Sequence, residues 1–235
     1  MPTAATTLAV TAASAAAGAS ATASAPVAAS EAAPAAATED RRITRSKRAL
    51  RAALIELTEE RGLDGFTVND LCARADLNRG TFYNHFHDKD DLLHTLEDEV
   101  IDDLSRIGEQ MRGLSVLELM RYRARKKPLP FLVTLFDYLR EQGDFLHAVL
   151  GRMGDAGFAP RLRDAVCTNL IEQILHERYR TDPTPFVQYY VAFFASAYLG
   201  VIQRWIETGM HESSEEMAII AMRLFFIKPG ESITL

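Results

Sequence analysis

Apolar residues recur at helical spacing along most of the chain, and no segment keeps the two-residue alternation of a strand. The first helical segment runs from about Thr44 to Arg61, and Gly62 follows it as a helix stop. Further segments of this kind, separated by Gly, Pro or Asp, lie near residues 115–125, 130–142, 144–151, 160–180, 185–208 and 213–227. The pattern predicts an all-α fold.

Two short helices joined by a tight turn are predicted within Phe66–Phe86. Thr67 and Asp70 form a capping box, which specifies the start of the first helix. Asn78 is a good N-cap for the second helix, which begins at about Arg79. The helical spacing gives the pair one apolar face, made by Val68, Leu71, Cys72, Ala75, Phe82 and Phe86.

The polar face of the second helix suits DNA. It carries Arg79, Thr81, Tyr83, Asn84 and His85, and no acidic residue follows until Asp88. Arg and Asn side chains can read guanine and adenine edges, whereas Tyr, Thr and His more often bind phosphates. A second interpretation is that these residues form a solvated helix surface, with Tyr83 covering apolar atoms.

Two residues beside this face support contact with a phosphate backbone. Gly80 lacks a side chain near the start of the second helix, where two backbones can approach closely. Asp88 is expected to cap a third helix and to place the ammonium group of Lys89 beside N-terminal amides, an arrangement that binds phosphate.

A long helix is predicted from Asp88 to about Gln110. Its apolar stripe consists of Leu93, Leu96, Val100, Leu104 and Ile107. The remaining surface is expected to be an acidic outer face, made by Glu97, Asp98, Glu99, Asp102 and Asp103.

The segment Phe186–Ile206 is apolar almost all round. Its length would cross a membrane, but Gln188, Gln203 and Arg204, together with the lack of positive flanks, argue against a spanning helix. A helix that is apolar on all sides is otherwise buried, in a core or between subunits.

Composition adds a local basic region to an acidic chain. The 235 residues have a formal net charge of -6 and are 48% hydrophobic, enough for a sizeable core. A run of cations leads into the first helix and is well placed for phosphates or a minor groove, namely Arg41, Arg42, Arg45, Lys47, Arg48 and Arg51. The Ala-, Ser-, Thr- and Pro-rich stretch 1–40 makes a poor secretory signal, because small polar residues interrupt it. It is expected to be a disordered tail, because it has no large side chains to pack.

The stretch from about Arg45 to Leu96 resembles the TetR family of bacterial transcriptional regulators. The similarity rests on the helix ending at Gly62 and on FTVNDLCARADLNRGTFYNHFHDKDDLL, with its Thr-Val opening, Gly-Thr-Phe-Tyr core and Phe-x-x-Lys-x-x-Leu close. It implies an N-terminal three-helix helix-turn-helix DNA-binding domain over 41–106 and a helical ligand-sensing and dimerisation domain over 107–235. The DNA-contacting residues implied by the resemblance and the basic run are Arg45, Thr67, Asn78, Arg79, Gly80, Thr81, Tyr83, Asn84, His85 and Lys89.

The resemblance also implies a cytoplasmic homodimer on a near-palindromic double-stranded operator, switched by a small-molecule effector. The last two long helices would pair with their mates, through Phe193, Ala197, Gly200, Val201, Trp205, Ile219 and Met222. Bulky aromatics could frame an effector pocket, for which the candidates are Phe131, Phe136, Phe158 and Tyr189. Repression is the family's default, and activation is compatible with the sequence.

Two other function classes compete with a DNA-binding regulator. A helical enzyme is disfavoured because no phosphate-binding loop, nucleophile elbow or paired metal ligands occur in the sequence, so no cofactor or metal is expected. Cys72 and Cys167 lie in apolar helical patterns and are expected to be buried thiols. The alternative function is a TetR-like dimer that docks on a protein without binding DNA, which the modest positive charge of the helix pair keeps open.

Overall fold

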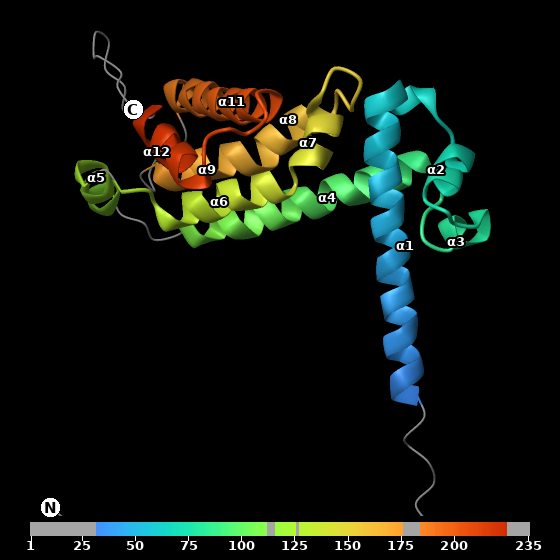
Figure 1. Cartoon of the computed structure of the whole chain (residues 1–235). Coiled ribbons are helices and arrows are strands. Elements are labelled where there is room, and N and C mark those ends of the chain that lie inside the picture. The colour runs from blue at the N-terminus through green and yellow to red at the C-terminus, as the bar shows by residue number, and fades with distance from the viewer. Residues whose placement is uncertain (1–31, 112–115, 126, 176–183, 225–235) are drawn as a thin grey trace, which may run out of the picture. The chain divides into compact units, whose positions relative to one another are not determined.

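The computed structural model describes residues 32–111, 116–125, 127–175 and 184–224, and all regular structure in these residues is helical (Figure 1). This confirms the predicted fold class. Contacts divide the chain into two units, residues 1–41 and 42–235. The first helix begins in the first unit, and the other helices lie in the second.

The first helix, α1, spans Ala32–Arg61 and therefore begins earlier than the expected start at Thr44. Alanines dominate residues 32–37, and alanine has the highest helix propensity, so the helix extends into the stretch assigned to the tail. Pro34 is tolerated because it lies in the first turn. The rest of the predicted tail, residues 1–31, lies outside the described residues.

The predicted helix pair is present. The 3-10 turn η1 (Leu63–Gly65) leads to α2 (Val68–Arg74) and α3 (Arg79–Tyr83). Fully buried side chains from each helix hold the pair against α1, including Leu54, Leu57, Leu71, Phe82 and Phe86. Burial of a side chain of this size contributes about 1.5–3 kcal/mol, so the apolar face fixes the orientation of α3.

The long helix α4 (Lys89–Gly108) connects this region to the C-terminal helices and continues into the turn η2 (Glu109–Met111). Its apolar stripe is buried as expected, except that Ile107 is only partly buried. The placement of Glu97 on the outer face is wrong, because its side chain is fully buried. Glu97 lies four residues after Leu93 and three before Val100, so helical geometry puts it on the apolar stripe.

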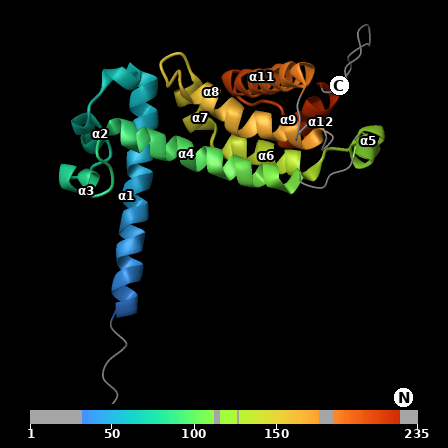
Figure 2. The ribbon, with the colours of Figure 1, turned by 180° about the vertical axis from the view of Figure 1, so that it is seen from behind.

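The C-terminal helices pack around α4 and α6 (Pro130–Glu141), which lie side by side in both ribbon views (Figures 1 and 2). The shorter helices are α5 (Val116–Ala124), α7 (Gly143–Leu150) and α8 (Phe158–Leu162). The predicted helix over 160–180 contains a π-helical segment, η3 (Arg163–Thr168), followed by α9 (Asn169–Ile174). Its expected last residues, 176–180, lie outside the described residues.

The last two helices have the predicted starts. α11 (Pro185–Glu207) is capped by Thr184, and α12 (Ser214–Leu224) is preceded by a capping box between Ser213 and Glu216. α12 packs on α6, and α11 packs on η3. One cluster of buried residues extends from α1 through α4 to α12, so the two predicted domains share a core.

Candidate nucleic-acid interface

The start of α2 is fixed by reciprocal hydrogen bonds. The backbone N–H of Thr67 donates to Asp70 Oδ2 at 2.8 Å, and the N–H of Asp70 donates to Thr67 Oγ1 at 3.4 Å. The Thr67 hydroxyl also donates to Asp70 Oδ2 at 2.6 Å, which holds the pKa of that carboxyl below its usual range. The Thr67 hydroxyl proton is therefore used within the protein. The role that the structure supports for Thr67 is to cap α2.

An arginine that the sequence analysis did not single out joins α2 to α1. Arg74 donates to Glu56 Oε2 at 2.8 Å and to Glu60 Oε2 at 2.7 Å. These contacts raise the pKa of Arg74 above its ordinary value, and the two carboxylates balance its positive charge. The signal in the sequence was the spacing of the two glutamates, which lie on one face of α1 four residues apart.

The turn between α2 and α3 uses a left-handed residue. Asp76 has φ +51°, a conformation that Asp tolerates better than most residues, and Leu77 N donates to Cys72 O at 2.9 Å. Asn78 Oδ1 then accepts a hydrogen bond from Gly80 N at 2.8 Å. Asn78 is confirmed as the N-cap, so its Nδ2 group is the part that can donate to a phosphate.

The face of α3 that points away from the core carries the predicted polar residues. Arg79, Gly80, Tyr83 and Asn84 are exposed, while Thr81 and His85 are partly exposed. The Arg79 guanidinium carbon lies 5.8 Å from the Tyr83 ring centroid. Tyr83 packs edge-on against Phe82, yet 49% of it is exposed, so its hydroxyl end is available to a ligand.

Gly80 leaves open space on this face. A Cβ atom built there would meet only Asn78 Oδ1, at the ordinary contact distance of 3.5 Å. No close approach within the described part of the subunit requires a glycine here. The missing side chain therefore matters most for a second molecule approaching α3.

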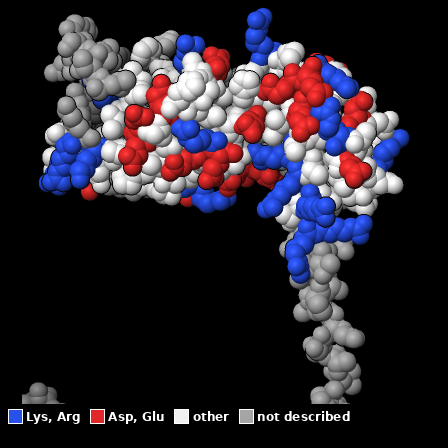
Figure 3. Space-filling view, in the orientation of Figure 1, with Lys and Arg blue, Asp and Glu red and all other residues white. Residues whose placement is uncertain are grey.

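Cations gather on α1 beside the helix pair, and acidic residues gather nearer its C-terminal end (Figure 3). Arg42, Arg45, Lys47 and Arg48 are all exposed. Arg51 differs, because it donates to Gln142 and its guanidinium carbon lies 4.7 Å from the centroid of the Phe145 ring. The basic run thus divides into an exposed part that can meet phosphates and one residue that braces the core.

Lys89 is partly withdrawn from the predicted phosphate site. Its ammonium donates to the carbonyl of Leu63 and lies 5.1 Å from the Phe66 ring centroid. One backbone amide at the start of α4 is also in use, since Asp91 N donates to Asp88 Oδ1 at 2.8 Å. In this conformation Lys89 stabilises the junction of η1 and α4.

The predicted dimer residues divide into an exposed and a buried group. Phe193, Ala197 and Gly200 are exposed on α11, and Val201 and Ile219 are partly exposed. Trp205 and Met222 are buried within the subunit. The Trp205 ring packs edge-on against Phe136 with centroids 5.4 Å apart, and its Nε1 donates to Glu212 O at 3.2 Å, so its contacts lie within the subunit.

α11 is the helix in the described part of the chain that is long and apolar enough to cross a membrane, by length and composition alone. Its outer stripe includes Phe186, Tyr189 and Phe193, which are 76%, 78% and 66% exposed. These large rings lie at helical spacing on one face, and the polar residues Gln188 and Arg204 lie on the same helix. Exposed apolar stripes of this kind mark contacts with another protein or with a membrane.

The four residues predicted to frame an effector pocket are not brought together. Phe136 and Phe158 are buried in the main core, and Phe131 packs in a separate cluster with Met111, Leu129 and Met222. Tyr189 lies on the surface instead. Aromatic composition identified the core but could not locate a cavity.

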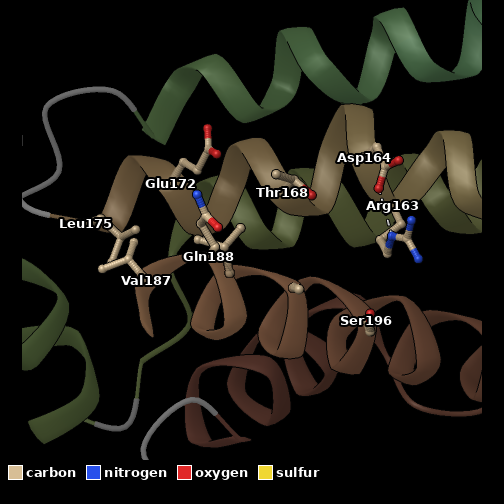
Figure 4. Close-up of a pocket in the computed structure, with 10 residues that line it drawn as sticks. Arg163, Asp164, Thr168, Glu172, Leu175, Val187, Gln188 and Ser196 are labelled. Carbon is tan, nitrogen blue, oxygen red and sulfur yellow. Dashed lines mark hydrogen bonds and ion pairs between the residues drawn. The ribbon is translucent and has the colours of Figure 1, made fainter. Parts of the chain in front are cut away.

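A cavity of about 420 Å³ lies elsewhere, between the η3–α9 segment and α11 (Figure 4). Its polar lining includes the ion pair of Arg163 and Asp164, in which Arg163 Nε lies 2.8 Å from Asp164 Oδ1. The other lining residues are Thr168, Glu172, Leu175, Val187, Gln188, Val191, Ala192 and Ser196. π-helical segments such as η3 frequently occur at functional sites.

Comparison with known proteins places this geometry in a family. Residues 46–96 match the family described as bacterial regulatory proteins of the tetR family, and residues 126–226 match a transcriptional regulator C-terminal region. The chain belongs to the TetR family. The matched N-terminal region contains both helices of the pair, and regulators of this family are not enzymes, as the sequence analysis expected.

Individual proteins share part of the sequence or the fold. An HTH-type transcriptional regulator of Bacillus subtilis (strain 168), YxbF, is 35% identical over 71 residues, 28% of this chain and 19% of that protein. A TetR transcriptional regulator from Streptococcus agalactiae 2603V shares the fold with a TM-score of 0.50 and 22% identity, over 80% and 98% of the two chains. A TetR family transcription regulator from Marinobacter aquaeolei VT8 has a TM-score of 0.50 and 18% identity, over 78% of this chain and 95% of that chain.

Proposed function

We propose that this TetR-family protein is a homodimeric repressor that binds a near-palindromic DNA operator through α3 and releases it in response to a small molecule. The observation that carries the proposal is the polar face of α3, which a cap, a left-handed turn and a buried Phe82 hold outward. A short helix fixed in this way matches the recognition helix of helix-turn-helix proteins, which enters the major groove.

Residues on α3 divide between base and phosphate contacts. Arg79 has no carboxylate partner among the described residues, so its guanidinium is available for a guanine edge. Tyr83 ends α3, Asn84 and His85 follow it directly, and all three suit the flanking phosphates. This arrangement lets one helix set both the register and the sequence preference.

The surface of α1 supplies most of the electrostatic attraction. Arg42, Arg45, Lys47 and Arg48 are exposed, whereas Arg74 is neutralised by its two glutamates. A DNA ligand would therefore meet the cations of α1 and Arg79, despite the net charge of -6. Each phosphate contact releases a counterion, so affinity falls steeply with salt.

The test measures binding to the DNA region upstream of the protein's own gene, by fluorescence anisotropy across a salt series. Arg79→Ala is expected to weaken binding by about 1–3 kcal/mol and to relax the preferred sequence. Arg106→Ala is the matched control, because Arg106 is an exposed arginine on α4 that pairs with Asp103. Wild-type affinity in both Arg79→Ala and Tyr83→Ala would contradict the proposal and favour the protein-docking alternative.

The sign of regulation needs a test in cells. Repression predicts that deleting the gene raises transcription from the bound promoter, and that the Arg79→Ala variant fails to restore the low level. Lower transcription in the deletion strain would instead identify an activator with the same DNA-binding mode.

The cavity between η3 and α11 is our candidate for the effector site. A volume of about 420 Å³ falls within the range of pockets that take small organic molecules. Its mixed lining, with Thr168, Gln188 and the Arg163–Asp164 pair beside Val187 and Val191, suits an amphipathic ligand with a hydroxyl group. Because α11 also carries the exposed stripe, a ligand wedged here would alter the geometry of the dimer.

Filling this cavity tests the assignment. Thr168→Phe is expected to preserve operator binding and abolish its response to added metabolites. Thr134→Phe is the matched control, because Thr134 lies exposed on α6 outside the cavity. An unchanged response in Thr168→Phe would place the effector elsewhere.

A further inference from the structure

A buried carboxylate on α4 is only half satisfied. Glu97 is fully buried, and its Oε2 accepts a hydrogen bond from Arg161 Nη1 at 2.6 Å. Its Oε1 is also buried and has no hydrogen-bond partner among the described residues. A buried polar atom left unsatisfied costs about 1–3 kcal/mol, so Glu97 Oε1 calls for a ligand.

Two further ligand groups face the same point. His94 lies one helical turn before Glu97, and Asp155 comes from the turn between α7 and α8. One ligand atom from each of the three side chains lies within 4.8 Å of the other two. One imidazole and two carboxylates form a donor set that binds divalent transition metals.

Asp155 is held in place by its own backbone. Its N–H donates to Val149 O at 2.9 Å, its Oδ1 accepts from Gly157 N at 2.9 Å, and its carbonyl accepts from Phe158 N at 3.2 Å. The carboxylate is therefore positioned by the turn itself and not by a long flexible side chain. Preorganisation of this kind favours ligand binding.

Charge at the cluster favours a cation. Glu97, Asp98 and Asp155 are acidic, and Arg161 is the cation that pairs with two of them. Two carboxylates repel unless a proton or a metal ion lies between them.

We propose that His94, Glu97 and Asp155 form a binding site for a divalent transition-metal ion of the Zn²⁺ class. Zn²⁺ binds such ligand atoms at about 2.0–2.2 Å. Small side-chain movements would bring the three ligand atoms to this distance from one ion, and His94 can move most because it is exposed. Water completes the coordination.

The ion would connect α4 to a turn that contacts the DNA-binding region. In that turn, Met153 O accepts a hydrogen bond from Leu63 N at 3.0 Å, next to the left-handed Gly62. A Cβ atom on Gly62 would lie 3.3 Å from Met153 Cβ, so the two segments pack closely. Metal binding would stiffen this junction and alter operator affinity, a consequence that rests on the proposed function.

The direct test needs no DNA. The full chain is treated with a chelator, dialysed and titrated with ZnCl2 by calorimetry, and with CoCl2 while visible absorption is recorded. We expect one ion per chain at this site, and affinity at least about tenfold lower in His94→Ala and Asp155→Asn, since even outer-shell changes cost 10–100-fold. His87→Ala, which removes another exposed histidine, is expected to bind as wild type does.

Unchanged Zn²⁺ binding in both His94→Ala and Asp155→Asn would overturn the site, as would a wild type that binds neither ion. His94 is exposed, so its removal does not endanger folding and the result stays interpretable. The two proposals can fail separately: a protein that binds Zn²⁺ here but no operator would refute only the proposed function.

Discussion

Asn78 has two roles that can be separated, because it caps α3 and borders the DNA-binding face. Removing the cap in Asn78→Ala is expected to lower the free energy of unfolding by about 1 kcal/mol, measured by urea denaturation. Asn78→Asp keeps an oxygen that accepts from Gly80 N, so stability is expected to stay near that of wild type. The added negative charge should still weaken operator binding.

A result in which Asn78→Asp binds the operator as tightly as wild type would contradict the placement of this residue beside phosphates. Asn78→Ser is the control, because serine caps the helix without adding charge. It is expected to resemble wild type in both measurements.

The two cysteines are predicted to be inert in the folded protein. Cys72 is 4% exposed and Cys167 is 3% exposed, and burial raises the pKa of the Cys167 thiol to about 12. The thiolate is the reactive form, so Ellman's reagent should detect no fast-reacting thiol in native protein and two thiols per chain in urea. A fast-reacting Cys167 in native protein would show that the η3 segment opens readily.

At the scale of elements, the exposed stripe of α11 is predicted to be the dimer contact. Phe193→Arg replaces a ring that is 66% exposed, so the subunit should keep its fold while losing its partner. Sedimentation or light scattering should then report a monomer, and far-UV circular dichroism should be unchanged. A dimeric Phe193→Arg variant would move the interface to another surface.

Gly200 offers a finer probe of the same stripe. A Cβ atom at this position would meet nothing within 4 Å in the described subunit, so Gly200→Ala should not strain the monomer. Its higher helix propensity favours folding by up to about 1 kcal/mol. Gly200→Trp places a large ring at this exposed position and should block close approach of a second helix and lower dimer affinity.

Local sequence signals predicted the helices well where one face was strongly specified. The Thr67 capping box, the Asn78 cap and the Pro185 start all lie as expected, because caps depend on a few neighbouring residues. The start of α1 was misplaced since its alanines favour helix without an apolar stripe. Burial of Glu97 was missed because charge was given more weight than helical position.

Long-range contacts were harder to predict from spacing. The withdrawal of Lys89 depends on the carbonyl of Leu63, 26 residues earlier in the chain. The same limit applies to Trp205, whose indole N–H donates to Glu212 while its ring packs on Phe136. Periodicity shows which face of a helix is apolar, but it does not show whether a core or a second subunit covers that face.

At the scale of the whole molecule, the proposed dimer has two copies of α3, and their spacing must match the helical repeat of DNA. Two copies of α3 related by a two-fold axis would enter successive major grooves, about 34–36 Å apart. Inserting about 5 base pairs between the half-sites rotates one half-site by about half a helical turn away from its copy of α3, since a full turn is about 10–10.5 base pairs. We expect this insertion to reduce affinity to the level of a single half-site, measured by gel shift, whereas substituting the same central bases without changing their number should have little effect. If the protein still binds both half-sites with unchanged affinity after the insertion, the two copies of α3 are not held at a fixed spacing. The idea that an effector acts by changing that spacing is then wrong.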